Sequence, residues 1–249
     1  LLDDCPMKIL FHRITTCVLL LCLAGKLTAR QYLFVAARKD SQLVSHEINV
    51  KTGKLTEHYS LKLPGSGGPM SLTQDRKHLY VESQIMVKRE KTAIPHIVSL
   101  QIKNGRFKQL HTTRVRLRSA STHVDASGKN LLAAHYKEGK VSVWRIDEKY
   151  RCTGELTDDH STTPRAHFIT TDPSNRFAYV PHTAPNVVFQ FTLDPDKGKL
   201  KPHKPPSVNG PDKENRYHEP RQYAHHSTLP MGYTSNERGG GICVTCWAV

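Results

Sequence analysis

Short apolar segments recur along the chain at a nearly constant interval. They occupy residues 31–35, 77–81, 129–134, 176–180 and 231–235. With Val35, Val81, Ala133, Val180 and Thr234 as matched positions, successive segments are 46, 52, 47 and 54 residues apart. Each of the first four is followed by a run in which apolar and polar residues alternate, as in "KVSVWRID", and this alternation is typical of β-strands. The pattern therefore predicts a repeated unit built from strands.

A second landmark has the same period. Glycines in the short polar segments "KTGKL", "KNGRF", "CTGEL" and "DKGKL", at residues 53, 105, 154 and 198, are 52, 49 and 44 residues apart and predict a turn in each repeat. No full repeat shows the 3.6-residue period of a helix. Units of about 40 to 50 residues built from four strands are β-propeller blades. The sequence predicts an all-β protein, a β-propeller whose blades each have four antiparallel strands.

The first 29 residues have a different character. Met7 is followed by the basic residues Lys8 and Arg13 and by an apolar stretch over residues 14–24. Eleven residues are too few for a transmembrane helix, which needs about 20, but they suit a secretory signal peptide. We therefore predict upstream residues and a removed signal peptide over residues 1–29, and an exported propeller, periplasmic or extracellular, over residues 30–249.

The chain is basic, and its charge limits the classes of partner. It carries a formal net charge of +14, which fits nucleic acid, a membrane surface or anionic small molecules. Basic residues are spread along the sequence rather than gathered in runs. Arg114, Arg116 and Arg118 alternate, which predicts a strand with all three on one solvated face. An anionic small molecule is the expected partner, and neither nucleic acid nor a membrane.

Two local motifs invite a metal interpretation that their spacing does not favour. Cys243 and Cys246 form a CxxC pair, but no second pair follows, and positions i and i+3 of a strand point to opposite faces. The adjacent His225 and His226 would also point apart in a strand. We expect ordinary strand cysteines, a lining role for the histidines, and no metal or other cofactor.

Four segments resemble consecutive blades of one known family. They are "GPMSLTQDRKHLYV", "THVDASGKNLLAAHYKEGKVSVWRID", "AHFITTDPSNRFAYVPHTAPNVVFQFTLDPDKGKL" and "EPRQYAHHSTLPMGYTSNERGGGI". The chain is similar to the lactonase family of seven-bladed β-propellers, which includes bacterial-type 6-phosphogluconolactonases and fungal carboxymuconate-lactonizing enzymes. The similarity covers about residues 30–246, and the last segment, with its Pro-Arg and Asn-Glu pairs before a glycine run, is its most distinctive part.

The resemblance implies a site built from His167, Arg221 and Glu237. His167 lies thirteen residues before Val180, as Arg221 lies thirteen residues before Thr234. We interpret Arg221 and Glu237 as flanking the innermost strand of the fifth repeat. His123, at the entrance of the third repeat, is a further candidate for substrate binding. The family's additional arginine from a later blade has no counterpart here.

These residue types suit the hydrolysis of a lactone, because that reaction needs an activated water and stabilisation of an oxyanion. Glu237 is the expected base, Arg221 would bind an anionic group or the oxyanion, and His167 would donate to the leaving alkoxide. The expected function is opening the lactone of a sugar acid. Two alternatives stay open: a carboxymuconate-type cycloisomerase, and a non-catalytic propeller in which Arg221 and Glu237 simply pair with each other.

Seven blades at this period need roughly 320 to 380 residues. The sequence is therefore expected to hold about four and a half blades of a C-terminally truncated seven-bladed protein. An open propeller exposes sheet edges, so we expect the isolated chain to be poorly stable and inactive.

Overall fold

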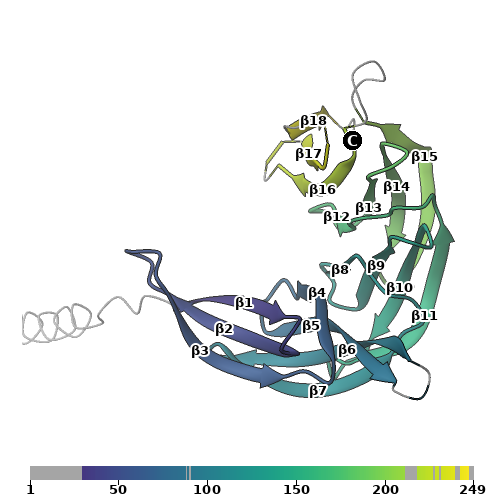
Figure 1. Cartoon of the computed structure of the whole chain (residues 1–249). Helices are drawn as coiled ribbons and strands as arrows, with labels where there is room; N and C mark the ends of the chain where they lie inside the picture. Colours follow the sequence, from purple (N-terminus) through teal and green to yellow (C-terminus); the bar gives the residue numbers. More distant parts are fainter. Residues whose placement is uncertain are drawn as a thin grey trace, which may run out of the picture.

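The computed structural model describes residues 30–87, 89, 91–210, 218–226, 228–229 and 231–238, and the backbone of residues 242–246. Throughout these residues the protein is all-β, as predicted, with eighteen strands in five antiparallel sheets. The sheets follow one another in chain order along an open arc (Figure 1). We number them as blades 1 to 5.

Three blades have four strands and two have three among the described residues. The strands of blades 1 and 2 are β1 (Gln31–Ala37), β2 (Gln42–Ile48), β3 (Leu55–Lys62), β4 (Ser66–Leu72), β5 (His78–Val87), β6 (Thr92–Lys103) and β7 (Arg106–Arg114). Those of blades 3 and 4 are β8 (Ser121–Val124), β9 (Asn130–His135), β10 (Lys140–Ile146), β11 (Cys152–Ser161), β12 (Thr170–Thr171), β13 (Phe177–His182), β14 (Val187–Asp194) and β15 (Lys199–Asn209). Blade 5 contains β16 (Pro220–His225), β17 (Met231–Asn236) and β18 (Ile242–Cys246).

In blades 2 to 5 the recurring apolar segment is the second strand, not the innermost one, and in blade 1 it is β1, the first described strand. In Figure 1, β4, β8 and β12 lie on the inner side of the arc, and β7, β11 and β15 form its outer rim. The prediction that residues 231–235 form an innermost strand was wrong, because β16 precedes β17 in the sheet. The innermost strands β8 and β12 have only four and two residues, so their weak apolar pattern hides them in the sequence.

The hydrophobic core lies between neighbouring blades rather than within them. In blade 3, all six residues of β9 are buried, because one face of the sheet packs on blade 2 and the other on blade 4. Leu132 packs with Val180 of blade 4, whereas Leu131 packs with Tyr80 of blade 2. Burial on both faces explains why these strands appear in the sequence as nearly continuous apolar runs.

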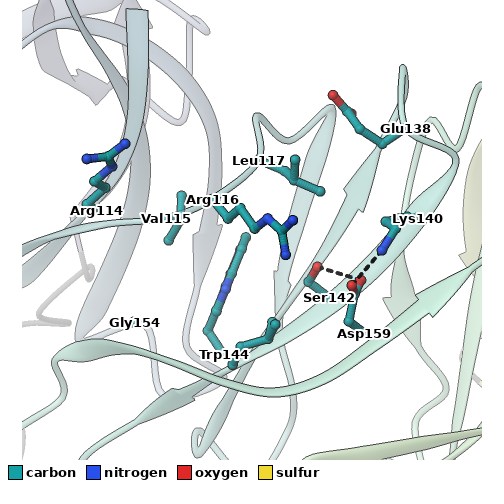
Figure 2. Close-up of a pocket in the computed structure, with 11 residues that line it drawn as sticks. Arg114, Val115, Arg116, Leu117, Glu138, Lys140, Ser142, Trp144, Gly154 and Asp159 are labelled. Carbon is teal, nitrogen blue, oxygen red and sulfur yellow. Dashed lines mark hydrogen bonds and ion pairs between the residues drawn. The ribbon is translucent and has the colours of Figure 1, made fainter.

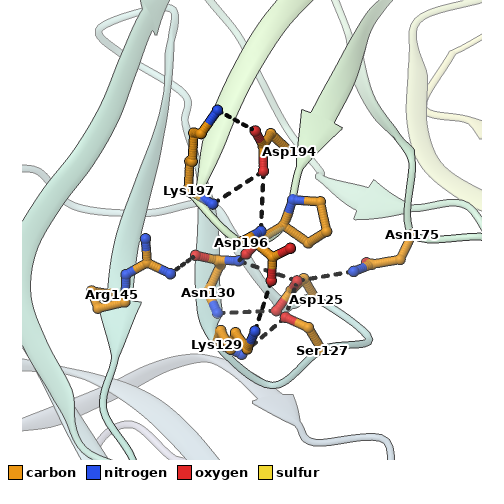
Figure 3. Close-up of polar contacts among 10 residues, drawn as sticks. Asp125, Ser127, Lys129, Asn130, Arg145, Asn175, Asp194, Asp196 and Lys197 are labelled. Atoms are coloured by element: carbon orange, nitrogen blue, oxygen red, sulfur yellow. Dashed lines mark hydrogen bonds and ion pairs between the residues drawn. The ribbon is translucent and has the colours of Figure 1, made fainter.

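A polar network joins blades 3 and 4 where their strands turn (Figure 3). Asp125 is fully buried and accepts hydrogen bonds from the backbone N of Asn130 and, across the blade boundary, from Asn175 Nδ2, both at 3.0 Å. Lys129 forms an ion pair of 2.7 Å with Asp196 of blade 4. Because Asn175 also accepts from the backbone N of Ala126 at 2.9 Å, the two turns are fixed relative to each other.

The glycine turns were predicted correctly in three of four repeats. Gly53, Gly105 and Gly198 lie between paired strands with φ near +70°, a conformation that favours glycine. Gly154 lies instead inside β11, beside a break in the β10–β11 register. The turn of that hairpin comes earlier, where Asp147 accepts a hydrogen bond of 2.9 Å from the backbone N of Arg151.

Arg114, Arg116 and Arg118 do not share one strand face. Arg114 ends β7, while the other two lie in the crossover that leads to β8, so the predicted strand was wrong here. The crossover is anchored because the backbone N of Val115 donates to the carbonyl of Pro95 at 3.0 Å. Arg114 and Arg116 line a surface cavity of about 610 Å³ beside Trp144 (Figure 2), whereas Arg118 lies at a second cavity described below.

The predicted signal peptide, residues 1–29, lies outside the described residues. Within the part of the chain that is described, no helix has the length and apolar character needed to cross a membrane.

Candidate active site

Arg221 and Glu237 lie together at one end of blade 5. Arg221 is at the start of β16 and Glu237 directly follows β17, and the antiparallel pairing of Pro220 with Asn236 brings these two ends side by side. Arg221 Nη1 and Glu237 Oε1 are 3.7 Å apart, and the two side chains are 46% and 37% exposed. The pair is held loosely, with both groups still accessible to a ligand.

His167 lies at the equivalent position of blade 4, just before β12. Its backbone N donates to the carbonyl of Pro181 at 3.0 Å, which fixes the main chain there. Partial burial is the main cause that lowers the pKa of His167; the Arg221 guanidinium lowers it further, and the Glu237 carboxylate raises it. The three residues expected from the sequence therefore influence one another electrostatically, although they come from two blades.

Tyr136 is a fourth member of this group that the sequence analysis did not identify. Its ring meets the His167 ring edge-on, with centroids 5.7 Å apart and planes at 88°. Tyr136 follows β9 in blade 3 as Glu237 follows β17 in blade 5. The repeat register alone relates Tyr136 to Glu237, because each lies three residues after the matched position of its repeat, Ala133 or Thr234.

A cavity of about 760 Å³ extends from His167 across blades 4 to 1, and we call it the mouth cavity. Its lining residues come mainly from the blade entrances and from the ends of the second strands: Arg38, Gly68, Pro69, Glu82, Gln84, Arg118, Ser119, Ala120, Tyr136, Lys137, Glu138 and His167. Gly68 and Ala120 occupy in blades 2 and 3 the positions that His167 and Arg221 occupy in blades 4 and 5. Small residues at these two entrances leave space for the cavity.

A buried carboxylate belongs to this cavity. Glu82, in β5, is only 1% exposed. Its Oε2 accepts a hydrogen bond of 2.8 Å from the backbone N of Ser119, and its Oε1 accepts one from Gln84 Nε2. Burial raises the pKa of Glu82, while the Ser119 hydroxyl, the two hydrogen bonds just named and the nearby Arg118 oppose the rise. Nothing local in the sequence distinguishes Glu82 from an exposed glutamate of a strand, so it was not among the predicted site residues.

His123 is placed apart from these residues. Its Nε2 is 3.0 Å from Thr171 Oγ1, a contact that joins the innermost strands β8 and β12. Burial lowers its pKa to about 4, partly opposed by Asp125. His123 is not among the residues that line the mouth cavity. Its contact with Thr171 is a link between blades.

The adjacent histidines His225 and His226 have separate surroundings. The His225 ring lies edge-on to Tyr179 and Tyr223, with centroids 5.0 and 4.8 Å away. His226 Nδ1 accepts a hydrogen bond of 3.0 Å from the backbone N of Leu229 and so stabilises a turn. As expected from their adjacency, one faces a neighbouring blade and the other a loop.

The repeated blades define the class of protein, and a family comparison agrees. Residues 33–247 match the family described as "Lactonase, 7-bladed beta-propeller". The chain therefore belongs to the lactonase family of seven-bladed β-propellers, as the resemblance in its sequence implied.

Relatives and solved structures extend this assignment. The chain is 26% identical to the 6-phosphogluconolactonases of Cronobacter sakazakii and Yersinia enterocolitica, over 88% and 86% of its length. It covers 61% and 60% of those proteins, or about three fifths of their length. A solved structure from Bacteroides fragilis has a TM-score of 0.73 at 14% identity, covering 90% of this chain and 66% of its own. The periplasmic gluconolactonase of Pseudomonas aeruginosa has a TM-score of 0.63 at 16% identity, covering 88% and 68%. At these identities the solved structures establish the fold alone.

Proposed function

We propose that the protein hydrolyses the lactone of a sugar acid, with the lactone ring bound between His167, Arg221 and Glu237. Because all three residues belong to described blades, we propose this activity in place of the inactivity expected from the open ring. The observation that carries the proposal is that His167, which lines a cavity of about 760 Å³ that is large enough for a monosaccharide lactone, is within electrostatic reach of the Arg221–Glu237 pair. The names of the bacterial relatives, 6-phosphogluconolactonases at 26% identity, support the same reaction.

In this proposal Glu237 acts as the general base. It takes a proton from a water molecule whose oxygen attacks the lactone carbonyl carbon. The carbonyl π electrons move to its oxygen, and the resulting oxyanion is stabilised by the Arg221 guanidinium. When the oxyanion collapses, the bond to the ring oxygen breaks and the proton held by Glu237 passes to that oxygen. Water is consumed, and the product is an open hydroxy acid.

His167 contributes a hydrogen bond rather than a full proton in this scheme. Its lowered pKa keeps the imidazole neutral at pH 7. A neutral imidazole has one N–H, which can donate to the ring oxygen as that oxygen gains negative charge. The edge-on contact with Tyr136 limits how far the His167 ring can rotate.

The charges of the mouth cavity favour an acidic product. Arg38, Arg118 and Lys137 line it, against Glu82 and Glu138. The formal net charge of the whole chain, +14, also attracts anions. We further propose that residues 1–29 direct export, as in the periplasmic gluconolactonase that shares this fold. An exported enzyme would act on an unphosphorylated lactone, because phosphorylated sugars are retained inside cells.

The test is hydrolysis of glucono-δ-lactone, followed by the acid released at constant pH. Glu237→Gln should lower kcat by about 10²- to 10⁴-fold, the usual contribution of a general base. Glu148→Gln, in an exposed turn outside the cavity, makes the same chemical change and should leave the rate unaltered. Wild-type protein that hydrolyses no sugar lactone, or a Glu237→Gln variant with wild-type kcat, would refute the proposal.

A further inference from the structure

Glu82 has a feature that the proposed reaction does not use. It is nearly completely buried, yet it lines the mouth cavity. No described lysine or arginine forms an ion pair with it. Burying a carboxylate is costly unless hydrogen-bond donors compensate it. An apolar residue would fill the same strand position without that cost.

The donors that Glu82 has do not satisfy it fully. Two carboxylate oxygens offer about four lone-pair sites. The backbone N of Ser119 and Gln84 Nε2 supply one donor to each oxygen, and the Ser119 hydroxyl is a third nearby donor. Acceptor capacity therefore remains on a group that lines a cavity.

Gly68 lies directly beside this carboxylate at the entrance of blade 2. A Cβ atom at Gly68 would lie 3.3 Å from the Glu82 Cβ and 3.6 Å from its Oε1. In blades 4 and 5 the equivalent position carries His167 and Arg221, whose side chains would cover the same area. Because Gly68 has no side chain, no entrance residue of blade 2 lies between the Glu82 carboxylate and the cavity that it lines.

From this geometry we propose that Glu82 and Gln84 bind the hydroxyl groups of a polyhydroxylated lactone ring and so determine specificity for sugar lactones over simple ones. The proposal rests on the proposed function. A carboxylate and an amide oxygen accept hydrogen bonds from hydroxyl groups, and a second anionic group at this point would be repelled. Arg118, on the same cavity, supplies donors to the hydroxyl oxygens.

Glu82 also has a structural task, and the test must separate the two. Its bond from Ser119 joins blade 2 to the entrance of blade 3. Glu82→Gln keeps one oxygen for that bond, and its new amide nitrogen can donate to Gln84 once the Gln84 amide turns its oxygen toward it, so the fold is retained. A structural role alone would then leave ligand preference unchanged.

The experiment measures binding by calorimetry with glucono-δ-lactam, a lactone analogue that resists hydrolysis, and with δ-valerolactam, which has the ring without hydroxyl groups. Wild-type protein should bind the hydroxylated lactam at least about 10-fold more tightly, because sites built to hydrogen-bond a hydroxyl reject analogues that lack it. Glu82→Gln should reduce this preference about 10-fold, with an unchanged unfolding temperature. Glu148→Gln is the matched control and should keep the wild-type preference.

Equal preference in wild type and Glu82→Gln would overturn the inference, and so would a wild-type protein that binds both lactams alike. If Glu82→Gln fails to fold, Gln84→Leu takes its place, with the same expected loss of preference. Lactone hydrolysis by the wild type decides the proposed function separately. A protein that hydrolyses gluconolactone but shows no dependence on Glu82 or Gln84 loses the inference alone.

Discussion

Replacing Asp125 by alanine should destabilise the protein more than any other single change to a turn of the described blades. Asp125 accepts from the backbone N of Asn130 at 3.0 Å and from Asn175 Nδ2 at 3.0 Å. Both donors belong to buried residues, so water cannot replace Asp125 as their hydrogen-bond acceptor. Each buried donor left without a partner costs about 1–3 kcal/mol. Removing the carboxylate also removes the free-energy cost of burying it, which offsets part of this loss. We therefore expect the free energy of unfolding to fall by about 3 kcal/mol.

Asp172 in blade 4 provides a matched control. It holds the equivalent turn through the backbone N of Ser174, Arg176 and Phe177, at 2.9, 3.0 and 2.8 Å. Those bonds stay within one half-buried turn, where water can replace the carboxylate. Asp172→Ala should therefore cost about 1 kcal/mol.

The assay is equilibrium unfolding in urea, monitored by circular dichroism and by the fluorescence of the buried Trp144. Asp125→Ala should lower the midpoint with an unchanged slope, and Asp125→Asn should lie between it and the wild type. Equal losses for Asp125→Ala and Asp172→Ala would refute the reasoning, because they would show that the bonds across the blade boundary contribute nothing.

Two further predictions concern histidines. Burial holds the pKa of His182 at about 4, against 6.5 in an unfolded chain. As the pH falls below 6.5, the unfolded state binds a proton at this residue and the folded state does not, so His182 lowers the stability of the fold in that range. Between pH 6.5 and 5 this group should lower stability by about 1 kcal/mol per pH unit on average. His182→Gln should remove that part of the pH dependence in urea unfolding, and an unchanged dependence would contradict the assignment. Arg221→Gln should raise the pKa of His167, and Glu237→Gln should lower it. NMR titration of the imidazole protons measures both shifts, and two shifts in the same direction would show that the three groups are not neighbours.

The sequence by itself determined the repeat, the fold class and three members of the candidate site. A period shared by apolar strands and glycine turns is a local property, because each blade repeats the same alternation and the same left-handed turn residues at Gly53, Gly105 and Gly198. The same period relates His167 to Arg221, since equivalent positions of neighbouring blades must meet at the same end of the propeller.

Only the tertiary structure decided which strand faces the inside of the arc and which charged residues share the cavity. The innermost strands β8 and β12 are too short for their pattern to show. Arg116 and Arg118 lie in a crossover because Val115 donates to Pro95 of blade 2. The packing of blade 3 on blade 2 decides the surroundings of Glu82, because it places the backbone N of Ser119 against the Glu82 carboxylate. Contacts between blades join residues far apart in the chain, so burial and hydrogen bonding at those positions depend on the packing of whole sheets.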